Sequence, residues 1–231
     1  MRMLADRETY ILDTIIRDYI AEAAPVSSHR VLEVRDFDLS PASIRNIMAS
    51  LEDDGYIYQP HTSSGRVPTQ KGYRYFVDYL MAEEVLSSDV EYRLDAIASL
   101  QDAVKTVAKE AHVFAMAVLQ ERDLFFNFGM QELLGEPEFQ DPDLVRKFSG
   151  LIDTLAEHQQ AYQEAIQERG FGVFIENENP LPEARCASVM VSGLRDGTGI
   201  LLTIGPTRMD YERTVRILRT SAYKLNDTYD A

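Results

Sequence analysis

The chain has 231 residues, 45% of them hydrophobic, a length that suits one large domain or two small ones with substantial cores. No run of about 18 apolar residues occurs, which excludes a membrane-spanning helix. The N-terminal residues lack the apolar core of a signal peptide, so we expect a cytoplasmic protein. The net charge of −15 is unfavourable for a nucleic-acid binder.

Two helices are predicted in the first 35 residues. Asp6 to about Ala23 has a broad apolar face at helical spacing. Pro25 breaks this helix, and Ser27 or Ser28 can cap a second, short helix that ends near Val34. Residues 36–39 then form the turn before a third helix.

The third predicted helix begins at Ser40, an N-cap residue followed by a proline in the first turn. Its apolar residues recur at helical spacing and predict one buried stripe: Ile44, Ile47, Met48 and Leu51. The opposite face carries small or polar side chains, Ala42, Asn46 and Ala49, and Ser43 and Arg45 flank it. Because asparagine pairs with adenine and arginine with guanine or phosphate, this face suits DNA reading. Plain packing would explain the helix alone equally well.

A hairpin follows, which we call the wing (residues 56–68). Gly55 can end the third helix, Tyr56–Tyr58 favours a strand, and Val67 lies in the returning one. The tip offers donors and one cation but no large apolar side chain: His61, Thr62, Ser63, Ser64, Gly65 and Arg66. Such a tip is not needed to fill a core. It therefore favours contact with DNA, and with Thr69 capping a fourth helix through Leu80 it completes a winged helix-turn-helix.

The positive charge of residues 55–77 only partly offsets the negative net charge of the chain. Residues 1–80 hold 9 basic and 12 acidic side chains, whereas residues 55–77 hold Arg66, Lys71 and Arg74 with no acid. Lys71 and Arg74 are candidates to hold phosphates. Asp53 and Asp54 should weaken phosphate attraction beside them, so we expect modest non-specific affinity and binding that depends on two subunits acting together.

The second half reads as an α+β domain after a polar linker at residues 82–91. Residues 92–119 are predicted as one long amphipathic helix or two, packed on a twin in a dimer or on the chain's own second half. A strand (residues 123–129), a short helix and turn (133–139) and a long helix (141–169) are expected next. Three strands (172–175, 187–194 and 199–204) and a final helix (210–226) complete it, with a hairpin turn at Asp196-Gly197.

Catalytic and metal chemistry find little support. The four histidines are scattered along the chain: His29, His61, His112 and His158. Cys186 has no cysteine partner and suits a small core residue. The sequence contains no phosphate-binding glycine loop. We therefore expect no enzyme, metal or cofactor. Glu176 and Glu178 could form a carboxylate pair, although a solvated turn is the favoured interpretation.

Two further features could serve a ligand. In the loop Gly205–Tyr211, Thr207 or Asp210 can cap the last helix, and Arg208 can anchor an acid or hold an anion, with a structural role favoured. Four aromatic residues could line a sensing pocket, although a core is the commoner explanation: Phe125, Phe128, Phe171 and Phe174.

The segment SIRNIMASLEDDGYIYQPHTSSGRVPTQKGYRYFVDYLM resembles the DNA-binding half of the HrcA family of heat-inducible transcription repressors. The second half resembles it through GMQELLGEPEF, Glu178–Leu181 and IGPTRMDY. The resemblance implies a GAF-like second domain, repression at an inverted repeat before chaperone operons, and possible chaperonin sensing. The chain departs by a gap between Leu119 and Asp123, where the family carries much of that domain and a dimerisation unit, and by Glu176 where the family usually has glycine.

The sequence thus predicts a winged helix-turn-helix DNA-binding domain (1–81), a linker or dimerisation helix (82–120) and a truncated GAF-like α+β domain (121–231). The favoured function is a homodimeric, sequence-specific repressor that binds double-stranded DNA. One alternative is a winged-helix regulator whose second domain binds a small molecule. Another is an enzyme that carries a winged helix, as some biotin ligases do, which the missing phosphate loop argues against.

Overall fold

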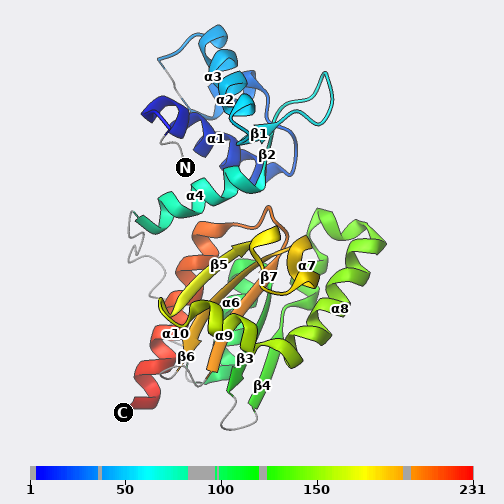
Figure 1. Cartoon of the computed structure of the whole chain (residues 1–231), viewed down its shortest axis with the longest axis vertical. Coiled ribbons are helices and arrows are strands. Elements are labelled where there is room, and N and C mark those ends of the chain that lie inside the picture. Colours follow the sequence, from blue (N-terminus) through cyan, green and yellow to red (C-terminus); the bar gives the residue numbers. More distant parts are fainter. Residues whose placement is uncertain are drawn as a thin grey trace. The chain divides into compact units, whose positions relative to one another are not determined.

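A computed structural model describes residues 4–35, 38–82, 97, 99–119, 124–194 and 199–230. The chain divides into two compact units, Met1–Glu84 and Val85–Ala231 (Figure 1). The expected turn at Asp196-Gly197 and linker at residues 83–91 lie outside the described residues. No described helix is both long and apolar enough to cross a bilayer.

The first unit has the element order expected of a winged helix-turn-helix. Its elements are α1 (Asp6–Glu22), α2 (Ser28–Val34), α3 (Pro41–Asp53), β1 (Ile57–Tyr58), β2 (Val67–Pro68) and α4 (Gln70–Ala82). The caps are confirmed: Ser27 accepts from the Arg30 amide and Ser40 from the Ser43 amide, each at 3.1 Å. Thr69 caps α4 through the Gly72 amide at 3.2 Å. These local bonds start each helix where the sequence predicts.

The wing is joined to the loop between α1 and α2. Val26 and Arg66 exchange two backbone hydrogen bonds, at 2.9 and 2.8 Å, which extend the β1–β2 hairpin by one bridge. Gly65 permits this approach, because a Cβ there would lie 2.4 Å from the Val26 carbonyl carbon. The base of the wing is therefore part of the body of the unit.

The second unit is built on a five-stranded antiparallel sheet in the order β4-β3-β7-β6-β5. The strands are β3 (Phe114–Leu119), β4 (Leu124–Phe128), β5 (Phe171–Ile175), β6 (Ser188–Leu194) and β7 (Gly199–Gly205). The α-helices are α6 (Leu100–Ala111), α7 (Met130–Leu134), α8 (Pro142–His158), α9 (Gln160–Ile166) and α10 (Tyr211–Asp230). Short 3-10 turns lie at Pro137–Gln140 (η3), Glu176–Glu178 (η4) and Pro182–Cys186 (η5). The predicted α+β class is confirmed.

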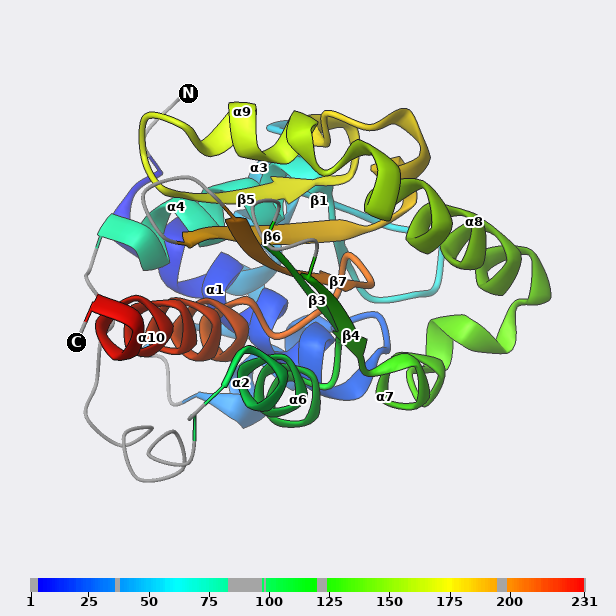
Figure 2. The same cartoon turned by 90° about the horizontal axis from the view of Figure 1, so that it is seen from below.

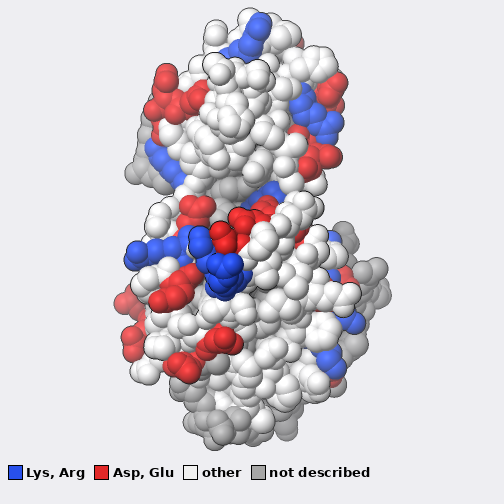
Figure 3. All heavy atoms as spheres, turned by 90° about the vertical axis from the view of Figure 1, so that its right-hand side faces the viewer, with Lys and Arg blue, Asp and Glu red and all other residues white. Residues whose placement is uncertain are grey.

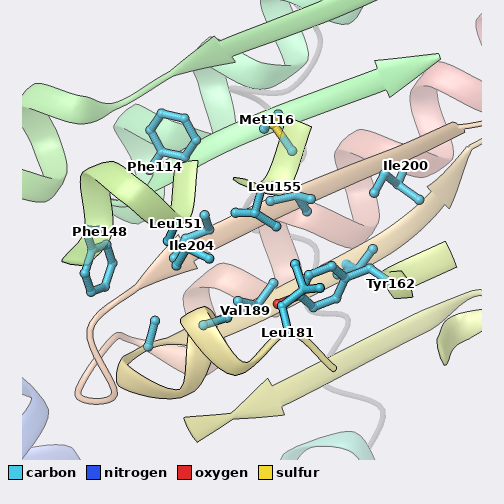
Figure 4. Close-up of a cluster of buried hydrophobic side chains, with 14 of the residues drawn as sticks. Phe114, Met116, Phe148, Leu151, Leu155, Tyr162, Leu181, Val189, Ile200 and Ile204 are labelled. Carbon is cyan, nitrogen blue, oxygen red and sulfur yellow. The ribbon is translucent and has the colours of Figure 1, made fainter. Parts of the chain in front are cut away.

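Helices cover both faces of this sheet. Figure 2 shows α6 and α10 side by side on one face and α8 and α9 on the other. Alternate strand residues face opposite layers, so Phe114, Met116 and Val118 enter the core under α8 and α9. Figure 4 shows other members of that core, drawn from helices and strands far apart in sequence: Phe148, Leu151, Leu155, Tyr162, Leu181, Val189, Ile200 and Ile204.

A buried polar centre ties the loops around η4 and η5 to α9. Asn179, 3% exposed, accepts from the Tyr162 hydroxyl at 2.9 Å. Its amide donates to three carbonyls at 3.0–3.1 Å, those of Glu176, Ala184 and Ala187. Burial raises the pKa of Tyr162, so the phenol stays neutral and donates. Within the Glu178–Leu181 motif, Asn179 therefore has a structural role.

The bounds of two helices predicted in the second half were wrong. Residues 114–119, expected to be helical as the end of one long helix or of a second one, form β3, the second strand of the sheet, and all six are buried. His112 ends α6 in the left-handed conformation (φ 54°), which the sequence does not signal. The helix expected over 141–169 is divided into α8 and α9 at Gln159. In the first unit, Ile47 is only half-buried rather than part of the closed stripe.

Candidate nucleic-acid interface

The outer face of α3 is open, as predicted. Arg45 and Asn46 are exposed, together with Ala42 and Ala49. Within the described part of the chain neither polar side chain makes a hydrogen bond or ion pair, so both are available to a ligand. Ser43 is half-buried, and its hydroxyl lies 2.9 Å from that of Ser40, so it is partly engaged in the cap.

The tip of the wing is held in shape by its own polar groups. The Gln59 side chain donates to the carbonyls of Thr62 (3.1 Å) and Ser64 (2.9 Å). The Ser64 hydroxyl accepts from the His61 amide at 3.0 Å. The side chains of His61, Thr62 and Ser63 remain exposed. The tip is thus preorganised, and Gln59, which the sequence analysis overlooked, is the residue that closes it.

The three cations counted in residues 55–77 all have partners. Arg66 Nε lies 2.9 Å from Glu52 Oε2, and the arginine side chain is 21% exposed. Lys71 donates to the Asp54 carbonyl at 2.5 Å and lies 4.3 Å from the Tyr56 ring centroid. Arg74 pairs with Asp78 at 3.2 Å. The local charge is therefore lower than the sequence window suggests, because acids outside the window lie beside it in space.

The surface of the first unit carries no broad basic area on the face seen in Figure 3. Basic and acidic side chains lie interspersed around a wide neutral region. Counterion release, which drives non-specific DNA binding, scales with the number of phosphates neutralised. This face therefore supports the expectation of modest non-specific affinity.

In the second unit, the Gly205–Tyr211 loop is fixed by internal bonds. Asp210 caps α10 by accepting from the Arg213 amide at 3.0 Å. Arg208 Nε donates to Glu138 at 2.6 Å, and its Nη2 donates to Glu136 at 2.6 Å. Hydrogen bonding to Glu138 raises the pKa of Arg208 above its ordinary value. The expected role for Arg208 as an anchor for an acid is confirmed.

The two glutamates at η4 do not form a carboxylate pair. Glu176 accepts from the Thr207 hydroxyl at 3.1 Å, and Glu178 accepts from the Ile175 amide at 3.0 Å. Glu176 has φ +47°, a left-handed conformation that favours glycine. This is the position where the resemblance implies glycine.

The four aromatic residues considered for a sensing pocket, or more commonly a core, together form neither, since Phe125 is exposed and the others are only half-buried. Phe125 and Phe128 lie on β4, whereas Phe171 and Phe174 lie on β5, and these strands are opposite edges of the sheet. A different hollow of about 700 Å³ has a mixed lining of amide side chains, glycines and isoleucines, including Gln160, Gln163, Gly170, Gly193 and Ile166. Cys186 is half-buried, and burial raises its pKa. The described residues hold no cluster of three or more metal-ligating side chains.

The fold and the open α3 face define a winged helix-turn-helix protein with an α+β second unit. The sequence model of the family described as "HrcA protein C terminal domain" matches residues 73–215. The chain belongs to the HrcA family.

Two named relatives agree with this assignment, and one solved structure shares the fold. The chain is 43% identical over 113 residues to the "Heat-inducible transcription repressor HrcA" of Methylobacillus flagellatus, an overlap of 49% of this chain and 33% of that protein. It is 36% identical over 163 residues to the protein of that name from Prosthecochloris aestuarii, covering 71% and 46%. A crystal structure titled as a hypothetical protein has the same fold, with a TM-score of 0.83, 20% identity, and coverage of 98% and 99%. The chain spans a third to a half of the length of these two named relatives.

Proposed function

We propose that this chain is a sequence-specific DNA-binding repressor that recognises an inverted repeat as a homodimer. One observation carries the proposal: Arg45 and Asn46 lie exposed and unpartnered among the described residues, on a firmly capped α3 beside a preformed polar wing. Its relatives are named as heat-inducible transcription repressors, which supports a role in heat-shock regulation. The first unit contributes both elements that the proposal places on DNA, α3 and the wing.

The residues divide the work by their chemistry. Arg45, Asn46 and Ser43 on α3 approach base edges or adjacent phosphates in the major groove. The wing tip contacts the backbone or the minor groove through His61, Thr62, Ser63, Ser64, Gly65 and Arg66. Lys71 and Arg74 lie at phosphates, where a phosphate oxygen competes with their present partners.

The second unit joins two copies so that two α3 helices lie one or more helical turns apart on DNA. Release from DNA on heating belongs to the same proposal, because the relatives are named as heat-inducible repressors. Modulation by a chaperonin is part of it only as an implication of the family resemblance. Each has its own test: the oligomeric state in solution, DNA binding across a temperature series, and DNA binding with added chaperonin.

Selection of bound duplexes from a random pool tests the proposal. We expect enrichment of a two-fold symmetric sequence with a fixed spacing. Asn46→Ala should then cost ~1–3 kcal/mol on the selected duplex and much less on random DNA. Gln131→Ala, which also removes a neutral amide at an exposed helical position but lies in α7, is the matched control and should change neither. Absence of enrichment would reject the proposal, and equal loss on both duplexes would remove Asn46 from base reading.

A further inference from the structure

Glu52 links α3 to both strands of the wing. It lies in the last turn of α3, and its side chain is 33% exposed. Oε1 accepts from the backbone amide of Gln59, just after β1, at 3.2 Å. Oε2 accepts from Arg66 Nε, just before β2, at 2.9 Å. One side chain of the helix thus binds the two points where the strands open into the tip.

The same contact continues into the tip. Gln59, fixed by Glu52 through its backbone, holds the carbonyls of Thr62 and Ser64 through its side chain. The tip therefore takes its position relative to α3 from a short chain of hydrogen bonds that begins at Glu52. A change in this carboxylate changes where the tip meets a duplex while α3 is seated in the groove.

Glu52 also has an electrostatic effect on the interface. Its charge offsets that of Arg66, one of the three cations in residues 55–77. Neighbouring Asp53 carries the same charge and is exposed, and its side chain makes no hydrogen bond or ion pair within the described ranges. The two acids therefore differ in contact with the wing, although they contribute alike to net charge.

We propose that Glu52 is a positioning residue that determines DNA specificity, holding the wing in place relative to α3 while lowering attraction to non-specific DNA. The inference rests on the proposed function. In a specific complex the aligned wing compensates for the charge that Glu52 neutralises. On random DNA, an aligned wing adds little to the affinity. The main effect of Glu52 there is to neutralise the charge of Arg66, which weakens binding.

The test compares Glu52→Gln, Glu52→Ala and Asp53→Asn in the full chain, on the selected duplex and on random duplex. Glu52→Gln should tighten random-duplex binding roughly five- to tenfold near ~0.1 M salt and steepen the salt slope by about one. The selected duplex should gain less, so the ratio of the two affinities falls several-fold. Asp53→Asn should tighten both duplexes alike and leave that ratio unchanged.

Amide hydrogen exchange gives a readout that needs no DNA. Glu52→Ala should speed exchange at the Gln59 amide, whereas Asp53→Asn should not. Equal effects of Glu52→Gln and Asp53→Asn on the affinity ratio would overturn the inference and leave Glu52 as ordinary surface charge. If the wild-type chain binds neither duplex, the proposed function and this inference both fall, and faster exchange at Gln59 would then show only a folding role.

Discussion

Two arginines, one in each unit, show how similar signals in a sequence lead to different roles. Arg66 and Arg208 both lie in polar loops that carry the family resemblance, and both pair with glutamate. Arg66 meets one carboxylate and is 21% exposed, whereas Arg208 meets two carboxylates and is 9% exposed. A phosphate can compete for the first arginine but is largely kept from the second.

The difference lies in how much each pair is separated from water. A partly exposed pair is screened and exchanges partners at small cost, which suits a surface that must accept DNA. Arg208, which donates to both carboxylate oxygens of Glu138 and to one of Glu136, is fixed, because removing it leaves uncompensated carboxylates. We therefore expect Arg208 to act on stability and Arg66 mainly on binding.

The largest expected effect is that of Arg208→Ala. Glu136 and Glu138, both about a quarter exposed, would face each other without a cation. We expect a loss of about 3–5 kcal/mol in the free energy of unfolding of the second unit, measured by urea denaturation. Arg146→Ala, which removes an ion pair whose side chains are 79% and 72% exposed, should change it by less than about 0.5 kcal/mol. Equal effects would contradict the distinction between buried and exposed pairs.

Gly65→Ala tests the joint between the wing and the body. The new Cβ would lie 2.4–2.5 Å from backbone atoms of Pro25 and Val26, so one of the two segments has to move. We expect about 1–3 kcal/mol of destabilisation in the first unit and faster amide exchange at Val26 and Arg66. Ser63→Ala, at the exposed tip, should be neutral within about 0.5 kcal/mol. Retained exchange protection in Gly65→Ala would show that the bridge is not needed to hold the wing.

Arg66→Ala should have the reverse profile to Arg208→Ala. Loss of a partly exposed pair should cost roughly 0.5–1 kcal/mol of stability. The salt dependence of DNA binding should flatten by about one unit of slope, because a cation is lost and Glu52 is left unpaired. The double variant with Glu52→Gln restores the net charge and should return the slope toward the wild-type value. A slope unchanged in Arg66→Ala would rule out a phosphate role for this residue.

Local signals predicted the first unit well. Ser40, Pro41 and Thr69 act through neighbours three or four residues away, so their roles as helix-start residues can be read from the sequence. The pairing of Glu52 with Arg66 joins residues fourteen apart and depends on how the hairpin returns. For that reason the charge count overestimated the free cations.

Non-local pairing explains the errors in the second unit. Phe114–Leu119 follows α6 without a proline or glycine, and a six-residue apolar run has no period that separates a buried strand from a buried helix. The aromatic residues of β4 and β5 were grouped by composition, but strand order places them at opposite edges. Strand order is set by pairing across the whole unit, which no local pattern encodes.

The smallest expected effect is that of replacing Glu176, where two contributions to the free energy of unfolding oppose each other. A φ of +47° costs a non-glycine residue about 1–2 kcal/mol of stability. Glycine avoids this cost, but it loses part of the gain because its unfolded chain has more conformational entropy. The Glu176 carboxylate, however, accepts from Thr207 at 3.1 Å, a bond that contributes roughly 0.5–1.5 kcal/mol. Glu176→Gly alone should therefore change the free energy of unfolding by less than about 0.5 kcal/mol. In a Thr207→Ala background, where the bond is already gone, the same substitution should stabilise by roughly 0.5–1 kcal/mol. Urea denaturation of the four proteins in this cycle measures both terms, and identical effects in the two backgrounds would show that the hydrogen bond does not offset the backbone strain.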